Sequence, residues 1–407
     1  MKLPQNGISS DALFATMRER KAADADWRGG RTWSLVYPAG EDVDAVLREA
    51  NNLYLFENAL NPFRFPSLRK MQAEVVAMTA DLLHGGDDAS GTMTSGGTES
   101  ILMAVETARE RGREEKGITK PEMVVPHSAH PAFAKAAKYL CVEMRQVPLR
   151  ADLRADVAAA AQLISDNTVL LVGSAPSYPH GVIDPITELA ALAAARNITF
   201  HTDACVGGFL LPFLERLGHP VPPWDFRVPG VTTISADVHK YGYCTKGASV
   251  IAHRSQATMQ YQIFMYDAWP GGLYGSTAMA GTRPAAPIAA AWAVMNYLGE
   301  AGYLRLQRIV IETAQQLRAG IAAIPGLHIW GEPDASLLAF GSESFDIAAV
   351  GDAMDDKGWH LDRQNNPAAL HLMVTPNHAK IVAQFLTDLR DAAALHGTSR
   401  GVQARYS

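Results

Sequence analysis

Lys240 stands in a sequence context that suits covalent chemistry. It lies within residues 235–249, which read Ser-Ala-Asp-Val-His-Lys-Tyr-Gly-Tyr-Cys-Thr-Lys-Gly-Ala-Ser, and β-rich runs flank this stretch at residues 231–234 and 250–252. The pattern predicts a loop between two strands, in the kind of crevice where α/β proteins bind ligands. A lysine beside glycine is often only a solvated loop residue, so a catalytic role for Lys240 depends on its partners.

A glycine-rich turn upstream has the composition of a phosphate-binding cradle. Residues 94–100 read Thr-Ser-Gly-Gly-Thr-Glu-Ser and open an apolar helical run. Glycines such as Gly97 let the backbone approach a ligand closely, and Thr98 can donate a hydroxyl. The turn lacks the Lys-Ser/Thr ending of a P-loop and the spacing of a dinucleotide fingerprint, so it favours neither a nucleoside triphosphate nor NAD. Taken alone, it is equally consistent with an ordinary helix N-cap.

Asp203 is the second candidate partner, at the carboxyl end of a predicted strand. Small residues follow it, among them Cys205. A strand-end carboxylate is commonly only a turn or cap residue. In combination, however, the glycine-rich turn, Asp203 and Lys240 meet the requirements of pyridoxal 5'-phosphate (PLP). A lysine forms a Schiff base with this cofactor, an aspartate keeps its pyridine nitrogen protonated, and a cradle binds its phosphate.

These motifs resemble those of the sphingosine-1-phosphate lyase family, within the group II PLP-dependent decarboxylases. The likeness rests on the His-Lys-Tyr-Gly-Tyr-x-x-Lys-Gly core, the Ser-Gly-Gly-Thr-Glu-Ser turn and the Asp-Ala-Cys-x-Gly-Gly-Phe segment, and it extends over residues 53–389. It implies PLP as the cofactor and an α/β fold of the fold type I PLP-dependent transferase-like class. That fold has a mainly parallel sheet flanked by helices, a smaller C-terminal α/β domain and an N-terminal helical arm.

The resemblance also implies roles for single side chains. His130, which would otherwise more often be a structural residue, is expected to stack over the cofactor ring and to bring an imidazole near the reacting carbons. Cys205 either packs below the ring or is buried filler. His239 is expected on the cofactor phosphate, and Lys246 supplies a second positive charge near the substrate.

A second glycine-rich segment, residues 271–284, is implied to act across a dimer interface. By itself such a segment is often only a turn. In the resembling family it crosses between subunits, so Gly275 and Ser276 are expected to reach the phosphate of the neighbour's cofactor. The resemblance therefore implies a homodimer with shared active sites.

Tyr178 carries a phenol that follows a predicted buried strand. It is a candidate general acid or base, or else a packing ring with a satisfied hydroxyl. Asp184, a few residues later, is expected to cap the next helix. Arg64 joins Lys246 as a candidate cation for a substrate phosphate. Its surroundings, residues 61–67, depart from the corresponding substrate loop of the family, which is usually longer and has a histidine near this arginine.

Composition limits the compartment and the partners. The chain has 407 residues, of which 48% are hydrophobic, so it can bury a large core. Its net charge of -6 comes from interspersed charges without a basic block, so nucleic acid is not an expected partner. Three cysteines without a CxxC pair favour a reducing compartment and no metal site. No apolar stretch is long enough to span a membrane. Members of the resembling family in nucleated cells carry a membrane anchor, so the resemblance implies a soluble, bacterial-type enzyme, which we expect in the cytoplasm.

The positions of apolar residues predict three domains. We expect an N-terminal arm with helices over residues 1–66, a large PLP-binding domain over 67–300 and a small C-terminal α/β domain over 301–407. Alternating strands and helices predict a parallel sheet that is covered on both faces. Strands are predicted at residues 123–126, 142–147, 169–172, 198–201, 231–236, 248–252, 327–330, 337–340 and 370–374. Helices are predicted at residues 9–20, 42–57, 67–83, 97–113, 131–140, 154–165, 185–196, 284–298, 303–321, 347–357 and 377–394.

The leading hypothesis is a PLP-dependent carbon-carbon lyase. It would cleave a phosphorylated long-chain amino alcohol, similar to sphingosine-1-phosphate, into a fatty aldehyde and phosphoethanolamine, with Tyr178, His130 or Lys240 as the base that takes the β-hydroxyl proton. The alternative is a PLP-dependent amino-acid decarboxylase, which needs no hydroxyl base. A cofactor-binding protein without turnover is a third hypothesis, and the combination of Lys240, Asp203 and Thr98 argues against it.

Overall fold

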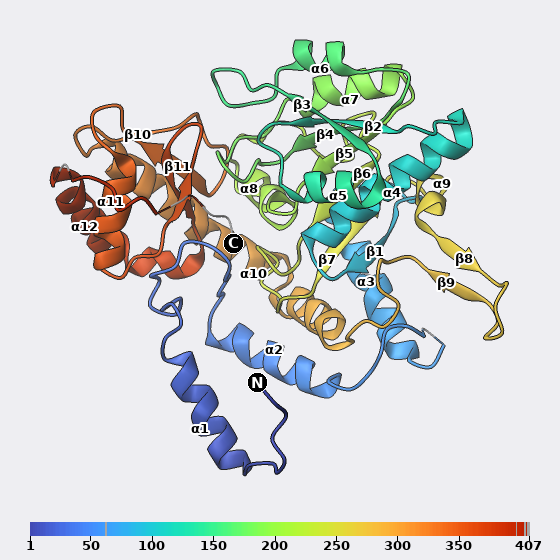
Figure 1. Cartoon of the computed structure of the whole chain (residues 1–407), viewed down its shortest axis with the longest axis horizontal. Helices are drawn as coiled ribbons and strands as arrows, with labels where there is room; N and C mark the ends of the chain where they lie inside the picture. Colours follow the sequence, from blue (N-terminus) through green and yellow to red (C-terminus); the bar gives the residue numbers. More distant parts are fainter. Residues whose placement is uncertain (62, 396, 403, 405–407) are drawn as a thin grey trace.

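A seven-stranded sheet forms the centre of the molecule in the computed structural model (Figure 1). The structure describes residues 1–61, 63–395, 397–402 and 404. The strand order is β1-β7-β6-β5-β4-β2-β3. Five strands, from β3 to β6 in this order, run parallel, and β7 is antiparallel to both of its neighbours, so the predicted mainly parallel sheet is confirmed. The strands are β1 (Ser90–Thr94), β2 (Glu122–Pro126), β3 (Glu143–Val147), β4 (Thr168–Ser174), β5 (Thr199–Asp203), β6 (Thr233–Ala236) and β7 (Ser249–His253).

Helices cover both faces of this sheet, because alternate side chains of a strand point to opposite sides. On β2, Met123 and Val125 pack into an apolar cluster with α4 and α5, whereas Val124 packs into the cluster that contains α3, α6, α7 and α8. The covering helices are α3 (Pro66–Leu82), α4 (Gly97–Lys116), α5 (Ala132–Leu140), α6 (Val157–Leu163), α7 (Ile186–Ala195) and α8 (Leu211–Arg216).

A four-stranded antiparallel sheet forms the core of the C-terminal part, which lies at one end of the molecule (Figure 1). The long helix α10 (Ala286–Ala322) connects the two sheets, and Gly299, with φ 52°, interrupts it between the two helices predicted there. The domain limits at residues 66 and 300 stay predictions. The elements of this part are β10 (His328–Ile329), β11 (Leu337–Gly341), β12 (Asp362–Gln364), β13 (Ala369–Met373), α11 (Ile347–Asp356) and α12 (Val382–Ala394).

The N-terminal segment joins the two parts. Helix α1 (Ser10–Lys21) buries none of its side chains, whereas α2 (Glu41–Leu53) packs along α10 through one apolar face. Between these helices, Trp33 is fully buried and stacks on His378 of the C-terminal part, with ring centroids 4.1 Å apart. In the part of the chain that the structure describes, no helix combines the length and the apolar character needed to cross a membrane.

Several short elements were not expected from the sequence. Strand β1 pairs with β7, although its Ser-Gly-Thr-Met-Thr sequence is polar and contains glycine. The glycine-rich segment after residue 263 contributes a hairpin of β8 (Phe264–Tyr266) and β9 (Tyr274–Ser276), which projects on the side away from the C-terminal part (Figure 1). Strand β12 is an edge strand of three residues. These elements matter because β1 ends at the glycine-rich turn and β12 contributes a residue beside Tyr178.

Candidate active site

A cavity of about 290 Å³ lies where the loops after β1, β2, β5 and β6 meet. All four strands run in the same direction, since β1 and β6 are both antiparallel to β7. Their carboxyl ends therefore lie at one edge of the sheet, where α/β proteins bind ligands. The structure therefore brings together six residues that the sequence analysis selected from distant positions in the chain. They are Gly97, Thr98, His130, Cys205, His239 and Lys240.

In the turn between β1 and α4, the backbone lies very close to the neighbouring loops. A Cβ atom at Gly97 would lie 2.7 Å from Cys205 Sγ and 2.8 Å from Asp237 Oδ2, so only glycine fits there without displacement. The carboxylate of Glu99 fixes the turn, because the backbone N–H and the hydroxyl of Ser95 both donate to its Oε2, at 2.7 and 2.6 Å. Thr98 lines the cavity beside these groups.

Asp237 is a site residue to which sequence reasoning assigned no role. Its Oδ2 lies 3.1 Å from Lys240 Nζ and 3.6 Å from His239 Nε2, and the residue is only 2% exposed. Burial raises the pKa of Asp237, but the nearby Lys240 and His239 have the larger combined effect and lower this pKa below its ordinary value. The carboxylate is therefore ionised and fixes the Lys240 amine. Its position three residues before the lysine, on the same turn, is the signal that could have identified it.

Asp203 is held rigidly at the end of β5. Its Oδ1 accepts hydrogen bonds from Ser235 Oγ and from the backbone N–H of Cys205, each at 3.1 Å. Ser235 is its partner in the β5–β6 register, so the sheet itself supplies this contact. Burial raises the pKa of the Cys205 thiol well above its ordinary value, so Cys205 presents a neutral thiol to the cavity.

His130 stands between two cavities. It lines the cavity of Lys240 and also a neighbouring cavity of about 230 Å³. The backbone N–H of Ala132 donates to His130 Nδ1 at 3.1 Å, so this nitrogen carries no proton. Burial lowers the pKa of His130. The ring is therefore neutral, with its proton on Nε2.

His239 and Lys246 lie on the loop that carries Lys240. The backbone N–H of Ala248 donates to His239 Nδ1 at 3.3 Å, and Lys246 Nζ donates to the carbonyl oxygen of His239 at 3.0 Å. The Lys246 ammonium also lies 4.6 Å from the centroid of the Tyr37 ring. Although part of this side chain is exposed, desolvation and the charge of Lys240 lower the pKa of Lys246 to about 8.

Tyr178 lines the neighbouring cavity beside His130. Its hydroxyl donates to Asp362 Oδ2 at 2.8 Å. Asp362 was missed because it lies on β12, which the sequence did not predict. Asp184 does not cap a helix with its side chain, contrary to the expectation, because its carboxylate accepts from the backbone N–H groups of Ser174 and Ala155.

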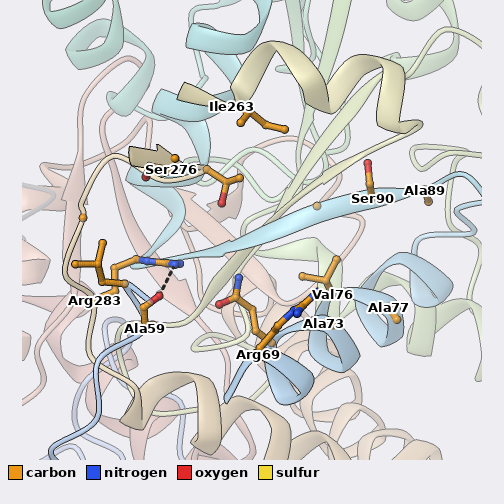
Figure 2. Close-up of a pocket in the computed structure, with 16 residues that line it drawn as sticks. Ala59, Arg69, Ala73, Val76, Ala77, Ala89, Ser90, Ile263, Ser276 and Arg283 are labelled. Atoms are coloured by element: carbon orange, nitrogen blue, oxygen red, sulfur yellow. Dashed lines mark hydrogen bonds between the residues drawn. The ribbon is translucent and has the colours of Figure 1, made fainter. Parts of the chain in front are cut away.

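Gly275 and Ser276 line a third cavity, of about 510 Å³, instead of the cavity of Lys240. Figure 2 shows Ser276 and Arg283 along one side of it and Val76 of α3 on another. The segment stays linked to the glycine-rich turn, because the backbone N–H of Met279 donates to Glu99 Oε1 at 2.9 Å. Arg64 is exposed on the loop before α3, and Pro62 of that loop lies outside the described residues.

The residues present fit PLP. A primary amine, a glycine that leaves no room for a Cβ and a neutral imidazole line one cavity, and the strand-end carboxylate of Asp203 lies next to it, bonded to the backbone of the lining residue Cys205. Asp237 Oδ1 is a buried carboxylate oxygen without a hydrogen-bond partner in the described part of the chain, as expected where a ligand completes a polar site. No group of three or more histidine, cysteine, aspartate or glutamate side chains that could hold a metal ion is found among the residues that the structure describes.

Comparison with known sequences places these motifs in a family. Residues 29–342 match the model of the pyridoxal-dependent decarboxylase conserved domain. The chain is 44% identical to a sphingosine-1-phosphate lyase of Oryza sativa subsp. japonica, over 96% of this chain and 74% of that protein. It is 43% identical to sphingosine-1-phosphate lyase 1 of Rattus norvegicus, over 96% of this chain and 69% of that protein.

Solved structures agree with this placement. The sphingosine-1-phosphate lyase of Burkholderia pseudomallei K96243 superposes with a TM-score of 0.94 at 39% identity, over 97% of this chain and 93% of that chain. A glutamate decarboxylase of Lactobacillus brevis, 19% identical with a TM-score of 0.86 over 99% of this chain and 96% of that chain, shares the fold. Together with the sequence relatives, these likenesses show that PLP is the cofactor and that the chain belongs to the sphingosine-1-phosphate lyase family of PLP-dependent enzymes.

Proposed function

We propose that this protein is a carbon-carbon lyase that cleaves a phosphorylated long-chain amino alcohol, such as sphingosine-1-phosphate, into a fatty aldehyde and phosphoethanolamine. The observation that carries the proposal is the likeness to sphingosine-1-phosphate lyases over 96% of the chain. The intact cavity around Lys240 supports it, because a chain that had lost the reaction would have no need to keep Lys240 paired with the buried Asp237 at that cavity.

Within this proposal, the residues of the first cavity hold the cofactor. Gly97, Thr98 and His239 would bind its phosphate, Asp203 would pair with its pyridine nitrogen, and Lys240 would be its covalent attachment point. His130 and Cys205 would pack against its ring. When bound, PLP supplies an electron sink for the carbon that loses its bond. The ionised Asp237 keeps the Lys240 amine in place for attachment and for its return after each turnover.

The geometry favours Tyr178 among the three candidate bases. His130 in its neutral form has no nitrogen lone pair left for a proton, since Nδ1 already accepts from Ala132 and Nε2 carries the proton. Lys240 is the proposed attachment point of the cofactor, and its Nζ lies 3.1 Å from Asp237 Oδ2. Tyr178 lines the cavity next to His130, and its hydroxyl donates to Asp362 Oδ2 at 2.8 Å. Its phenol oxygen can therefore accept the β-hydroxyl proton while its own proton passes to the Asp362 carboxylate. Lys246 and Arg64 are the candidate cations for the substrate phosphate.

We also propose a homodimer in which each subunit completes the other's site. Gly275 and Ser276 lie in a cavity apart from Lys240 of their own chain. The hairpin that carries them exposes large apolar side chains, among them Phe264 (58% exposed), Met265 (56%) and Leu273 (69%). An apolar projection of this size needs a covering surface. A second copy, related by a two-fold axis, supplies such a surface and brings the same loop to each site.

We place the reaction in the cytoplasm as part of the proposal. The three cysteines, Cys141, Cys205 and Cys244, form no disulfide, which suits a reducing compartment.

A direct assay compares two substrate classes on the purified, PLP-loaded protein. One reaction contains a phosphorylated long-chain amino alcohol, and the others contain single amino acids from a panel. We expect fatty aldehyde from the first and no carbon dioxide from the panel. Carbon dioxide from an amino acid without any aldehyde would assign a decarboxylase, and no product in either assay would leave a cofactor-binding protein.

A further inference from the structure

The C-terminal sheet holds Tyr178 from two directions. The Tyr178 hydroxyl donates to Asp362 Oδ2 at 2.8 Å, while His371 Nε2 donates to the Tyr178 carbonyl oxygen at 2.9 Å and the His371 ring packs 4.5 Å from the phenol ring, centroid to centroid. Asp362 and His371 are direct partners in the β12–β13 register. One pair of facing residues therefore fixes both the main chain and the side chain of Tyr178.

The surrounding turn is fixed to the same sheet. Gln364 Nε2 donates to the carbonyl oxygen of Pro179 at 2.8 Å, and the backbone N–H of Asp334 donates to the carbonyl oxygen of Gly181 at 2.9 Å. The Asp334 carboxylate in turn accepts from the backbone N–H of Ile183 at 2.7 Å. The phenol consequently has little freedom to reorient, because both flanks of its turn are held.

The direction of the Tyr178–Asp362 hydrogen bond determines what the phenol offers to a ligand. A phenol has one proton and an ionised carboxylate can only accept, so the proton of Tyr178 is committed to Asp362. Burial raises the pKa of Asp362, and hydrogen bonds from Tyr178 and Ser34 oppose that rise by favouring the ionised form. A ligand group that reaches the phenol oxygen in this cavity therefore meets an acceptor.

We infer that Asp362 is a positioning residue for Tyr178. By accepting the phenol proton, Asp362 makes Tyr178 select a ligand with a hydrogen-bond donor, the β-hydroxyl of the substrate. A ligand with an acceptor at the same carbon, such as a ketone, is then disfavoured. The inference rests on the proposed function, which places the amino alcohol between His130 and Tyr178. Its structural basis is the cavity that these residues share with Asp362 and Gln364.

Binding of two uncleavable ligands to the PLP-loaded protein tests this selection without turnover. Both ligands are long-chain phosphonates of equal length without an amine, one with a hydroxyl and the other with a ketone at the β-position. Isothermal titration calorimetry gives their dissociation constants. We expect wild type to bind the hydroxyl ligand roughly tenfold more tightly, as one hydrogen bond allows. Asp362→Leu frees the phenol proton to donate to the ketone, so the preference should vanish or reverse.

Two further variants make the outcome decisive. Tyr178→Phe keeps the ring and removes the oxygen, so it should also bind both ligands equally, even if Asp362→Leu proved too unstable to study. Asp334→Asn weakens the same turn without touching the phenol, so it should keep the preference. A preference that persists in Tyr178→Phe or Asp362→Leu, or equal binding by wild type, would overturn the inference while the proposed function stands. Failure of wild type to bind either phosphonate would overturn the proposed function and this inference with it.

Discussion

The Lys240–Asp237 pair positions the reactive amine. The Lys240 Nζ lies 3.1 Å from the buried Asp237 carboxylate, which restricts its position, whereas a solvated lysine samples many rotamers. Lys246, the other lysine of the loop, instead donates to a backbone carbonyl oxygen and is partly exposed. The two amines of one motif are thus distinguished by their partners, which their spacing in the sequence could not reveal.

Replacement of Lys240 tests the assignment of the attachment point. We expect Lys240→Ala to lose the yellow absorbance of covalently attached PLP, because the remaining loop amine, Lys246, is held at the carbonyl oxygen of His239. Absorbance spectra and borohydride reduction followed by peptide mass spectrometry provide the measurement. Lys246→Ala serves as the matched control and should keep the attached cofactor. A borohydride-stable adduct on Lys246 in the Lys240→Ala protein would show that the assignment is wrong.

Replacement of Asp203 tests the electrostatic role of the strand-end carboxylate. Asp203→Asn keeps the side-chain shape but removes the charge that keeps the pyridine nitrogen protonated. A preorganised term of this kind is commonly worth ~2.7–4 kcal/mol, so kcat should fall by about a hundredfold or more. Asp184→Asn is the control, since Asp184 is also a buried carboxylate but accepts only backbone N–H groups, and it should lower Tm without a comparable loss of kcat. Activity of Asp203→Asn within a few-fold of wild type would reduce Asp203 to a structural role.

At the scale of elements, the β1–α4 turn decides how closely the chain approaches the cofactor. The turn is packed between the loops that follow β5 and β6, since Cys205 Sγ and Asp237 Oδ2 both lie within 3 Å of where a Cβ on Gly97 would stand. The sequence identified the turn from its glycines and hydroxyls. The reason for glycine at this position became visible only when the neighbouring loops were in place.

Gly97→Ala should therefore weaken cofactor binding. Insertion of a methyl group into a packed site typically costs about 1–3 kcal/mol, which corresponds to a PLP dissociation constant roughly five- to 150-fold higher. Absorbance titration of the apoprotein with PLP measures this change. Gly86→Ala is the matched control, because a Cβ there meets no atom within 4 Å, and its affinity should equal that of wild type. Unchanged affinity in Gly97→Ala would place the phosphate elsewhere.

The elements predicted from the sequence were those with strong local patterns. Strand β4 contains an apolar run, β5 follows the apolar Ile198 and ends at Asp203, and helices α4 and α7 have apolar residues at helical spacing, so these elements were predicted close to their observed bounds. Strands β1 and β12 have polar sequences and form because a partner strand pairs with them, β7 far along the chain for β1 and the following strand β13 for β12. Local propensity does not contain that information.

The site residues divide in the same way. Lys240, Asp203, Gly97 and His130 stand at the ends of predicted strands or in recognisable turns. The fold brings Lys240, Gly97 and His130 to one cavity, whereas Asp203 lies behind its lining residue Cys205. Asp362 was missed because its strand was missed. Asp237 stood in the quoted motif, but its role depends on a side-chain distance, which no pattern of residue types specifies.

At the scale of the whole molecule, the hairpin of β8 and β9 is the element that leads us to propose a dimer. It projects with exposed apolar side chains on the side away from the C-terminal part (Figure 1) and carries Gly275 and Ser276 into a cavity other than that of Lys240. In the proposed dimer, this loop contributes to the site of the second subunit, and a mixture of inactive subunits can test that proposal.

We expect activity to return when Lys240→Ala and Ser276→Trp proteins exchange subunits. If the loop crosses the interface, both defects fall in one site of the mixed dimer and the other site is intact, so an equal mixture should recover about a quarter of wild-type activity. The readout is aldehyde release before and after verified exchange. A mixture of Lys240→Ala with Asp203→Asn is the control and should stay inactive, because each site of that mixed dimer keeps one defect. Background activity after exchange in the first mixture would assign the loop to its own chain's site.

The most direct measurement of the proposed reaction follows two carbon atoms. A phosphorylated long-chain amino alcohol, labelled with carbon-13 at Cα and at Cβ in separate samples, is converted by the PLP-loaded protein and the products are resolved by mass spectrometry. We expect the Cβ label only in the fatty aldehyde, the Cα label only in phosphoethanolamine, and the two products in equal amounts. Both labels in one product, or no consumption of this substrate while an amino acid loses carbon dioxide, would contradict cleavage of the Cα–Cβ bond.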